Sequence, residues 1–421
     1  MNKTWPGRAG FLLLLAPLTA CGGGDGGAPP VTVVPAPAPT PPPAPPLVPP
    51  AAQKDCTDAD CPELVVVGDP YDMANGWRSA FSGYADPSLT RDADGGLWMA
   101  YSWPHLRPSG AGQVAAIDAH LARSIDGGET WQFAQTLWAT NTGRFSQPGG
   151  NLNGVDLFET PSIHYAPSVP GPTRWFGARW AYFFGEDGRA GSRLRGQLLA
   201  ADPPAGLASA PAVTLGSRDL NAQYSADVEL HRLASEVADC QFWGEPGLYS
   251  QAGRLYVQLR CLRIGQAGLS IPNSSLYLFS ADPARLADQA GWQFHGKLAG
   301  AEEGALFGGI GVNQGDIVEL RDGRLGLIAS AQFDSGGSSD LSNSKGCAIF
   351  EIASLQDARL ALRPDGRPVV RAFISSRSLE PLGPGACAYH PSLVSGILQV
   401  KRVAPPGGGL QASIRRTGIH P

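Results

Sequence analysis

A repeating pattern of hydrophobic and polar positions runs through most of the chain after residue 84. Each copy has a proline or glycine, a small or polar residue, an aliphatic pair, a turn, and then a strand of alternating or aromatic-rich side chains. The copies are YADPSLTRDADGGLWMAYSW at 84–103, FETPSIHY with RWAYFFG at 158–165 and 179–185, GEPGLYSQAGRLYVQLRC at 244–261, NQGDIVELRDGRLGLIAS at 313–330 and YHPSLVSGILQVKRV at 389–403. Helical periodicity is weak, and only 233–239 and 283–289 favour a helical turn or two.

The spacing of the copies predicts the architecture. Successive copies are 74, 85, 69 and 76 residues apart when they are aligned on Pro87, Pro161, Pro246, Gly315 and Pro391. A unit of about 70 to 80 residues holds two β-hairpins with their loops, which is the size of a four-stranded propeller blade. We therefore predict an all-β fold, a five-bladed β-propeller with four-stranded antiparallel blades. A β-sandwich or a two-domain all-β protein is the alternative.

The two ends of the repeat region are expected to close the ring. The last copy shows strands only near 392–403 and 410–417, so it lacks an outer strand. The segment ELVVV at 63–67 forms an extra strand ahead of the first copy. Pairing between them would join the ends of the ring and remove an exposed sheet edge.

The N-terminal residues have the pattern of a secretory signal. Lys3 and Arg8 precede the apolar run FLLLLAPL, which is far shorter than the roughly 20 residues that span a bilayer. The following LTAC resembles the bacterial lipobox, and this resemblance implies cleavage before Cys21 and attachment of lipid to that cysteine. An ordinary cleaved signal is the alternative. Gly22 stands where an aspartate often marks retention at the inner membrane, so we expect the outer membrane.

The composition divides the chain into three parts. Residues 21–52 are rich in Gly, Pro and Ala and cannot bury an apolar core, which predicts an extended tether. We expect a signal peptide at 1–20, a lipidated tether at 21–52 and a single propeller domain at 53–421. Contact with the membrane would then be through the lipid on Cys21 only, in a bacterial cell envelope.

Charge and cysteine content narrow the function classes. The net charge is −5 with no block of like charge, so nothing indicates binding to nucleic acid, and we expect a monomer. Six cysteines remain besides Cys21, and an even number in an oxidising compartment suggests three disulfides. Local spacing favours the pairs Cys56 with Cys61, Cys240 with Cys261, and Cys347 with Cys387.

One eight-residue stretch, SIDGGETW at 124–131, combines turn formers with one large aromatic residue. It matches the Asp box of sialidases and other propeller proteins, also called the BNR repeat, at Ser124, Asp126, Gly128, Thr130 and Trp131. In that family the box lies at the blade periphery, away from substrate. We interpret it as a hairpin turn that stabilises the fold, with the tryptophan packed beneath it.

The repeat also places a polar residue directly before each aligned proline or glycine. These residues are Asp86, Thr160 (preceded by Glu159), Glu245, Gln314 and His390. The innermost strands of a propeller converge on one axis, so we expect these side chains to meet at the mouth of the ring. Paired carboxylates of this kind suit glycoside hydrolysis, which needs one ionised group and one protonated group.

Asp86 in ADPS and Glu245 in GEP resemble motifs of the five-bladed propeller glycosidases, namely the arabinanase and β-xylosidase group and its invertase-like relatives. The resemblance implies that Asp86 is the base or nucleophile and that Glu245 is the general acid. Glu159, or the nearby Asp156, would be the third carboxylate that orients substrate or tunes the acid. His390 is similar to a blade-five histidine of some arabinanases, which implies a possible Ca²⁺ ligand; no other cofactor is expected.

Several residues beside these positions are candidates for binding a sugar, although packing in the core is the more common role for each taken alone. They are Trp103, His105, Trp243, Gln314, Tyr389 and His390. The pattern departs from the arabinanase group, where the acid glutamate belongs to the fourth blade; here the fourth copy offers Gln314 and Asp316.

Three functions stay open. A glycoside hydrolase acting on a glycan is the main expectation, and a non-catalytic Asp-box propeller that binds glycan or protein is the alternative. A sialidase or a polysaccharide lyase is the third. Sialidases carry Tyr-Arg-Ile-Pro where this chain has Tyr84, Ala85, Asp86 and Pro87, and Ala85 cannot form the bidentate ion pair with a sialic carboxylate. A lyase would need a base such as Tyr389 or His390.

Overall fold

A computed structural model describes most of the chain after residue 51. The described residues are 52–57, 59–70, 81–109, 112–147, 150–185, 195–216, 226–265, 268–269, 275–332, 344–375, 384–403 and 410–421. The expected signal peptide, the lipidated Cys21 and nearly all of the tether lie outside them. Within these ranges, none of the helices is long and apolar enough to span a membrane.

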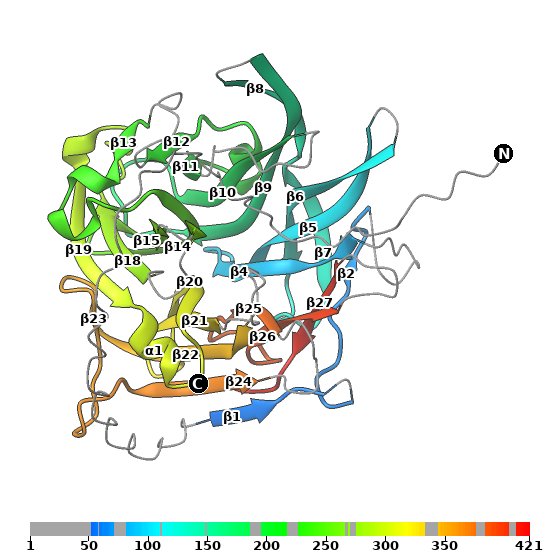
Figure 1. The fold of residues 1–421 in the computed structure, drawn as a ribbon. Helices are drawn as coiled ribbons and strands as arrows, with labels where there is room; N and C mark the ends of the chain where they lie inside the picture. Colours follow the sequence, from blue (N-terminus) through cyan, green and yellow to red (C-terminus); the bar gives the residue numbers. More distant parts are fainter. Residues whose placement is uncertain are drawn as a thin grey trace, which may run out of the picture.

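Five small sheets surround one axis and form a five-bladed β-propeller, which confirms the fold that the repeat predicts (Figure 1). Blade one has β4 (Ala85–Arg91), β5 (Leu97–Ser109), β6 (Gly112–Ser124) and β7 (Trp131–Trp138). Blade two has β9 (Gly150–Tyr165), β10 (Trp175–Gly185), β11 (Arg195–Ala201) and β12 (Val213–Gly216). Blade three has β14 (Phe242–Gln251), β15 (Arg254–Leu262), β18 (Ser275–Ala281) and β19 (Trp292–Ala299). Blade four has β20 (Gly311–Glu319), β21 (Leu325–Gln332), β22 (Ser344–Ser354) and β24 (Val370–Ser375). Blade five has β25 (Pro384–Ala388), β26 (Leu398–Val403), β27 (Leu410–Arg416) and β3 (Phe81–Gly83).

Short elements extend these blades or join them. They are the strands β8 (Asn141–Gln147), β13 (Val228–Glu229), β16 (Ile264–Gly265), β17 (Gly268–Leu269) and β23 (Arg359–Leu360), the helix α1 (Ala301–Ala305), and the 3₁₀ turns Pro204–Ala208, Leu230–Arg232, Ser235–Val237 and Gln289–Gly291. A helical turn therefore forms within 233–239, as expected, while 283–289 consists of turns that lead into the last 3₁₀ element.

The hydrophobic core lies between neighbouring blades. Each of the five blade interfaces has its own cluster of buried apolar side chains, for example around Trp243 between blades two and three, and around Trp131 between blades five and one. Strands sandwiched between two blades are buried on both faces, so they appear in the sequence as nearly continuous apolar runs such as SLYLFSA in β18.

An N-terminal strand closes the ring, as expected, but it is not the predicted segment. The outer strand of blade five is β3, which pairs in parallel with β27. The predicted segment 63–67 contacts β27 through the bridge between Glu63 and Arg415, and the backbone N–H of Leu64 donates to the carbonyl of Ile414 at 2.8 Å. Val66–Val67 (β2) then adds to β7 of blade one. The prediction was wrong in this detail because the segment crosses from blade five to blade one at that point. The alignment on Pro391 also missed the innermost strand of blade five, β25.

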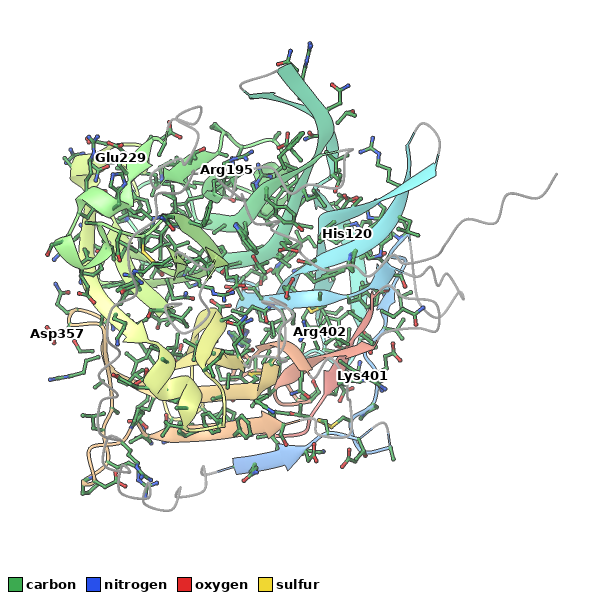
Figure 2. The ribbon with its side chains drawn as sticks, in the orientation of Figure 1. His120, Arg195, Glu229, Asp357, Lys401 and Arg402 are labelled. Atoms are coloured by element: carbon green, nitrogen blue, oxygen red, sulfur yellow. A yellow bond between two sulfur atoms is a disulfide. The ribbon has the colours of Figure 1, made fainter. Side chains whose placement is uncertain are left out.

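The described N-terminal residues, 52–57 and 59–70, run along the outer edges of three blades. Their first strand, β1 (Ala52–Asp55), pairs in parallel with β24 of blade four. At their other end the buried Asp69 accepts a hydrogen bond from Tyr101 and pairs with His120 of blade one at 2.8 Å (Figure 2). These N-terminal residues therefore contact blades four, five and one and connect them to one another.

The three predicted disulfides are confirmed. Cys56 pairs with Cys61, Cys240 with Cys261 and Cys347 with Cys387, and the Cα atoms of the pairs are 5.5, 5.7 and 6.1 Å apart. The last of them joins β22 of blade four to β25 of blade five.

The stretch SIDGGETW forms the predicted hairpin turn, between β6 and β7. Asp126 accepts hydrogen bonds from the backbone N–H and the hydroxyl of Thr130, at 2.9 and 2.6 Å, and from the hydroxyl of Ser124 at 2.7 Å. These bonds lower the pKa of Asp126 to about 2, the hydroxyl of Thr130 contributing most. Trp131 is fully buried and donates to the carbonyl of Gly128 at 3.1 Å. The turn packs on Leu393 and Val394 of blade five.

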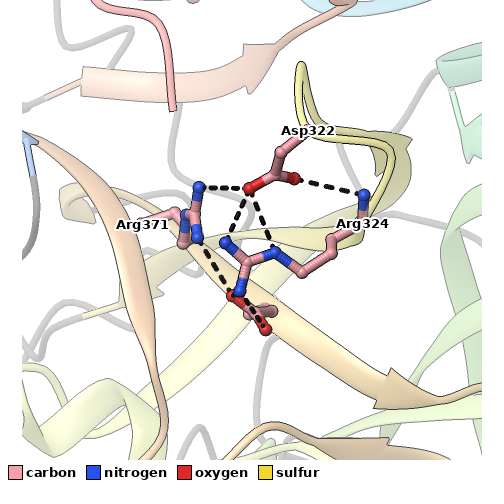
Figure 3. A network of polar contacts seen from close by, with 4 residues as sticks. Asp322, Arg324 and Arg371 are labelled. Atoms are coloured by element: carbon pink, nitrogen blue, oxygen red, sulfur yellow. Dashed lines mark hydrogen bonds and ion pairs between the residues drawn. The ribbon is translucent and has the colours of Figure 1, made fainter.

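Blade four carries a cluster of charged side chains near the turn between β20 and β21 (Figure 3). Arg324 contacts Asp322 at 2.6 Å and Glu351 at 2.8 Å, and Arg371 contacts the same two carboxylates at 2.8 and 3.2 Å. The four side chains tie the β20–β21 turn to β22 and β24. Because the arginines are partly exposed, solvent screens these pairs and each contributes little to stability.

Candidate active site at the propeller axis

Four innermost strands are interrupted at the same point by a β-bulge. The pairing register shifts at 85/88 in β4, at 244/247 in β14 and at 313/316 in β20, and it shifts between β9 and β10 opposite 159–162. One residue of each bulge has a positive φ, at 46–50°. These residues are Asp86, Thr160, Glu245 and Gln314. The polar positions predicted from the repeat therefore share one backbone conformation.

The residue that follows each bulged position explains why the bulge forms there. Pro87, Pro161 and Pro246 have no N–H to donate to the ladder, so a break in pairing costs nothing at these points. The fourth copy has Gly315, because a Cβ there would lie 2.3 Å from the side-chain oxygen of Gln258. A non-glycine residue with positive φ costs about 1–3 kcal/mol, and such residues cluster at functional sites.

The bulges surround a small cavity on the axis, with a volume of about 30 Å³. Its lining comes from all five blades: Asp86, Pro87, Ser88, Thr160, Pro161, Glu245, Pro246, Gln314, Gly315, Asp316, Ala386 and Cys387. The placing of His390 in this ring was wrong. The corresponding break in blade five lies between Pro384 and Cys387, so an alanine and a cysteine occupy that place.

Gln314 bridges two of the predicted catalytic carboxylates. Its side-chain amide donates to Asp86 at 2.6 Å, and its backbone N–H donates to Glu245 at 2.8 Å. Glu245 also accepts a hydrogen bond from Arg260 at 2.7 Å, and both side chains of this ion pair are buried. Arg260 in turn donates to Gln332 at 2.7 Å. Two donors, one of them a cation, thus fix the position of the Glu245 side chain.

The third predicted carboxylate, Glu159, lies beside the other two. Its pKa is raised to about 8, first by burial and then by the negative charges of Asp86 and Glu245. The hydroxyl of Tyr182 is 3.2 Å from its Oε2. Asp156, the alternative third carboxylate, instead lies 3.8 Å from Arg195 of blade two.

Asp86 has a lower pKa than Glu159. Burial raises its pKa to about 6, with the charge of Glu245 adding to the effect, while a hydrogen bond from Ser102 and the cation of Arg402 oppose it (Figure 2). At neutral pH Asp86 is therefore mostly ionised and Glu159 is mostly protonated. We call Asp86, Glu159, Glu245 and the adjoining cavity the carboxylate end of the axis.

Asp316 forms part of the cavity wall between three blades. It accepts hydrogen bonds from the Ser88 hydroxyl at 2.9 Å and from the backbone N–H groups of Leu248 and Ile317 at 3.3 and 3.0 Å. Burial raises its pKa to about 7. It joins blades one, three and four beneath the catalytic candidates.

The aromatic residues predicted to bind a sugar lie in the core. Trp103, Trp243 and Tyr389 are at most 1% exposed, and His105 is buried with its ring stacked 4.0 Å from that of Trp103. The prediction that Trp103, Trp243 and His105 contact substrate was wrong, because they lie on strand faces that pack between blades. Tyr389 follows β25 and, although buried, lies beside the larger cavity together with His390. His390 lies at the opposite end of the axis, near His164.

Sequence reasoning missed several residues near the carboxylates. Tyr182 and Arg260 contact Glu159 and Glu245, and Trp180 packs so tightly on Gly244 that a Cβ there would be 2.8 Å from its ring. One signal was available for Arg260. A lone cation inside the apolar strand LYVQLRCL requires a buried partner.

The expected calcium site at His390 does not fit the structure. The Nδ1 atom of His390 accepts a hydrogen bond from the backbone N–H of Ser392 at 3.1 Å, and the carboxylates lie at the other end of the axis. In the part of the chain that the structure describes, no group of three or more His, Cys, Asp or Glu is placed to hold a metal ion.

No family model and no curated protein matches this chain. Among solved structures it is similar to the α-L-arabinofuranosidase from Lactobacillus brevis (TM-score 0.42, 13% identity, covering 80% of this chain and 92% of that one). It is also similar to the GH32 β-fructofuranosidase of Bombyx mori (TM-score 0.41, 11% identity, covering 80% of this chain and 61% of that one). A third similar structure is the α-L-arabinanase of Penicillium chrysogenum complexed with arabinobiose (TM-score 0.39, 11% identity, covering 82% of this chain and 98% of that one). Similarity at this level carries no activity over to this chain.

Proposed function

We propose that the protein is a glycoside hydrolase whose chemistry takes place at the carboxylate end of the axis. The observation that supports this most directly is the separation of the pKa values of Asp86 and Glu159, at about 6 and about 8. Glycoside hydrolysis needs one ionised and one protonated carboxyl group across the scissile bond. These two side chains supply that pair at neutral pH.

The roles follow from the contacts of each group. Glu159 gives its proton to the oxygen of the departing sugar. Asp86 either takes a proton from the attacking water or attacks the anomeric carbon itself. The resemblance to propeller glycosidases implied Glu245 as the acid, but its two carboxyl oxygens already accept hydrogen bonds from Arg260 and from the backbone N–H of Gln314. We therefore assign the proton donation to Glu159 and a positioning role to Glu245.

The size of the cavity indicates where the sugar would lie. A volume of about 30 Å³ accommodates one or two water molecules and no sugar ring. The substrate would therefore rest outside it, on the face where the long hairpins β5–β6 and β8–β9 extend beyond the bulges (Figure 1). A water in the cavity would be close to Asp86.

The N-terminal sequence supports a location for this activity. With lipid on Cys21 and a proline-rich tether up to residue 52, the propeller would work on a glycan of the bacterial cell envelope, attached to the outer membrane.

The experiment compares the full-length protein with Asp86→Asn, Glu159→Gln and Glu245→Gln variants on aryl glycosides and polysaccharides. Loss of the acid is masked by a good leaving group, so Glu159→Gln should cleave dinitrophenyl glycosides far better than nitrophenyl glycosides. Asp86→Asn should be impaired on both. Glu129→Gln, an exposed change on blade one, is the control.

Two outcomes would contradict the proposal. Turnover by Asp86→Asn and Glu159→Gln equal to that of the parent would exclude these residues. Glycan binding with no turnover of any substrate by the parent would instead favour the non-catalytic alternative.

A further inference from the structure

The opposite end of the propeller axis contains a second and much larger cavity. The innermost strands run from the bulges to this end, and residues near their C-terminal ends line a volume of about 550 Å³. The side chains that matter for the argument are Arg91, His164, Tyr165, Tyr249, Glu319 and His390. We call this cavity the imidazole end of the axis. Its volume lies in the range of about 300–1,000 Å³ that is typical of small-molecule sites.

The two histidines are neutral over the physiological pH range. Burial lowers the pKa of each to about 4, and the two rings are close enough for His390 to lower the pKa of His164 further. Because Ser392 donates its N–H to Nδ1 of His390, the neutral ring carries its proton on Nε2. His164 has Nε2 at 2.9 Å from the hydroxyl of Ser250. The pair therefore offers hydrogen-bond donors and acceptors without charge.

The charged groups of the cavity have mixed signs. Arg91, Asp94 and Glu319 are exposed, and the ion pairs found among the described residues include none of the three. Asp92 is already engaged by the backbone N–H of Gly96 and by the indole of Trp98, at 2.7 and 2.8 Å. One arginine beside two exposed carboxylates and neutral imidazoles does not suit a highly charged anion.

Aromatic faces complete the lining. Tyr165 and Tyr249 are partly exposed in the cavity, and the Tyr249 ring lies 5.6 Å from that of His164. An amphipathic ring of this kind packs against the C–H face of a sugar while polar neighbours take its hydroxyls.

We propose that the imidazole end binds a neutral saccharide of one or two sugar units, at a site separate from the carboxylate end. The combination of cavity volume, uncharged donors and acceptors, exposed side chains of both signs and two partly exposed tyrosines matches a polyhydroxylated ligand. The proposal does not depend on hydrolysis at the carboxylate end, because it concerns binding alone.

The experiment measures binding to the full-length protein by saturation-transfer-difference NMR, followed by calorimetry. The probes are L-arabinose, D-xylose, D-galactose, sucrose and cellobiose. The variants are Asp86→Asn and Glu159→Gln at the carboxylate end, and Arg91→Met, Glu319→Gln and Tyr249→Ala at the imidazole end. Arg91 and Glu319 are exposed, so their variants should fold even if Tyr249→Ala does not. Glu129→Gln is again the control.

The expected result is that at least one probe binds the parent, the control and both carboxylate-end variants equally. The imidazole-end variants should bind it about tenfold or more weakly. Failure of all five probes to bind would overturn the proposal. So would weakening by Asp86→Asn or Glu159→Gln alone, which would place the sugar at the carboxylate end. A rise in melting temperature with inorganic phosphate or Zn²⁺, and with none of the sugars, would assign the cavity to another class of ligand.

Discussion

The two ends of the propeller axis hold protons in opposite ways, although the same physical cause acts at both. At the carboxylate end, burial raises the pKa of Asp86 to about 6 and that of Glu159 to about 8. At the imidazole end, burial lowers the pKa of His164 and His390 to about 4. Desolvation disfavours the charged form whatever its sign, so acids keep their protons and bases lose them.

This difference separates what each end can do. A buried acid that keeps its proton at neutral pH can act as a proton donor, which is the property that catalysis needs. Buried neutral imidazoles offer hydrogen bonds but no proton to give, which suits binding. Under the two proposals, the same fold would support chemistry at one end and recognition at the other.

The largest expected effect is on catalysis at the carboxylate end. Glu159→Gln removes the proton donor and should lower kcat by about 100- to 10,000-fold on a substrate with a poor leaving group. Glu129→Gln should leave kcat unchanged. The measurement is steady-state kinetics. A Glu159→Gln variant as active as the parent would show that the carboxylate end has no proton donor at this position, and the proposed difference between the two ends would fail.

The next effect is on folding. Arg260→Met would leave the buried carboxylate of Glu245 without its cation, and we expect a loss of about 3–5 kcal/mol of unfolding free energy. The matched control in the same blade is Arg285→Met, which breaks the exposed pair with Asp288 and should cost far less unfolding free energy. Denaturant unfolding measures both. Equal losses of unfolding free energy in the two variants would show that the buried ion pair of Arg260 and Glu245 matters no more for stability than an exposed pair.

The pH dependence of catalysis should be bell-shaped. Activity requires ionised Asp86 and protonated Glu159, so kcat/KM should fall below pH about 6 and above pH about 8. In Glu159→Gln the alkaline limb should disappear while the acid limb remains. An alkaline limb that persists in this variant would assign it to another group.

A smaller effect is expected on the pH dependence of stability. The folded pKa of Glu159, about 8, lies above its ordinary value of 4.5, so its contribution is fully present below about pH 4.5 and is lost as the pH rises from there through about 8. Glu159→Gln should therefore gain stability relative to the parent between about pH 4.5 and 8. Thermal unfolding across this range tests it, and a constant difference between the two proteins would argue against a buried acid.

The smallest effect is the opposite dependence of stability on pH at the imidazole end. The folded pKa of His164 lies below its unfolded value of about 6.5, so its contribution is present above that pH and is lost as the pH falls toward about 4. His164→Asn should lose less stability than the parent between pH 6.5 and 4. Parallel unfolding curves for the two proteins over this range would contradict the neutral imidazole.

Much of the fold was predictable because the repeat is local. The copies with Asp86-Pro87, Thr160-Pro161 and Glu245-Pro246 carry their own bulge signal, since a proline marks the place where the ladder breaks. The disulfide pairs were predictable for a similar reason, because short separations bring the cysteines together within a blade or between adjacent blades. The alignment failed in blade five, where Gly385 and Ala386 carry no polar side chain to mark the bulge.

The sequence by itself determined the strand pattern, the number of blades and the carboxylates that meet on the axis, because each depends on residues close together in one repeat. Only the tertiary structure decided which aromatic residues are buried, as Trp103 and Trp243 are, and that His390 lies at the other end of the axis. It alone also decided that the pKa of Glu159 is raised and that Arg260 lies against Glu245. These properties depend on how far neighbouring blades exclude water and bring charges together, and no single stretch of the chain contains that information.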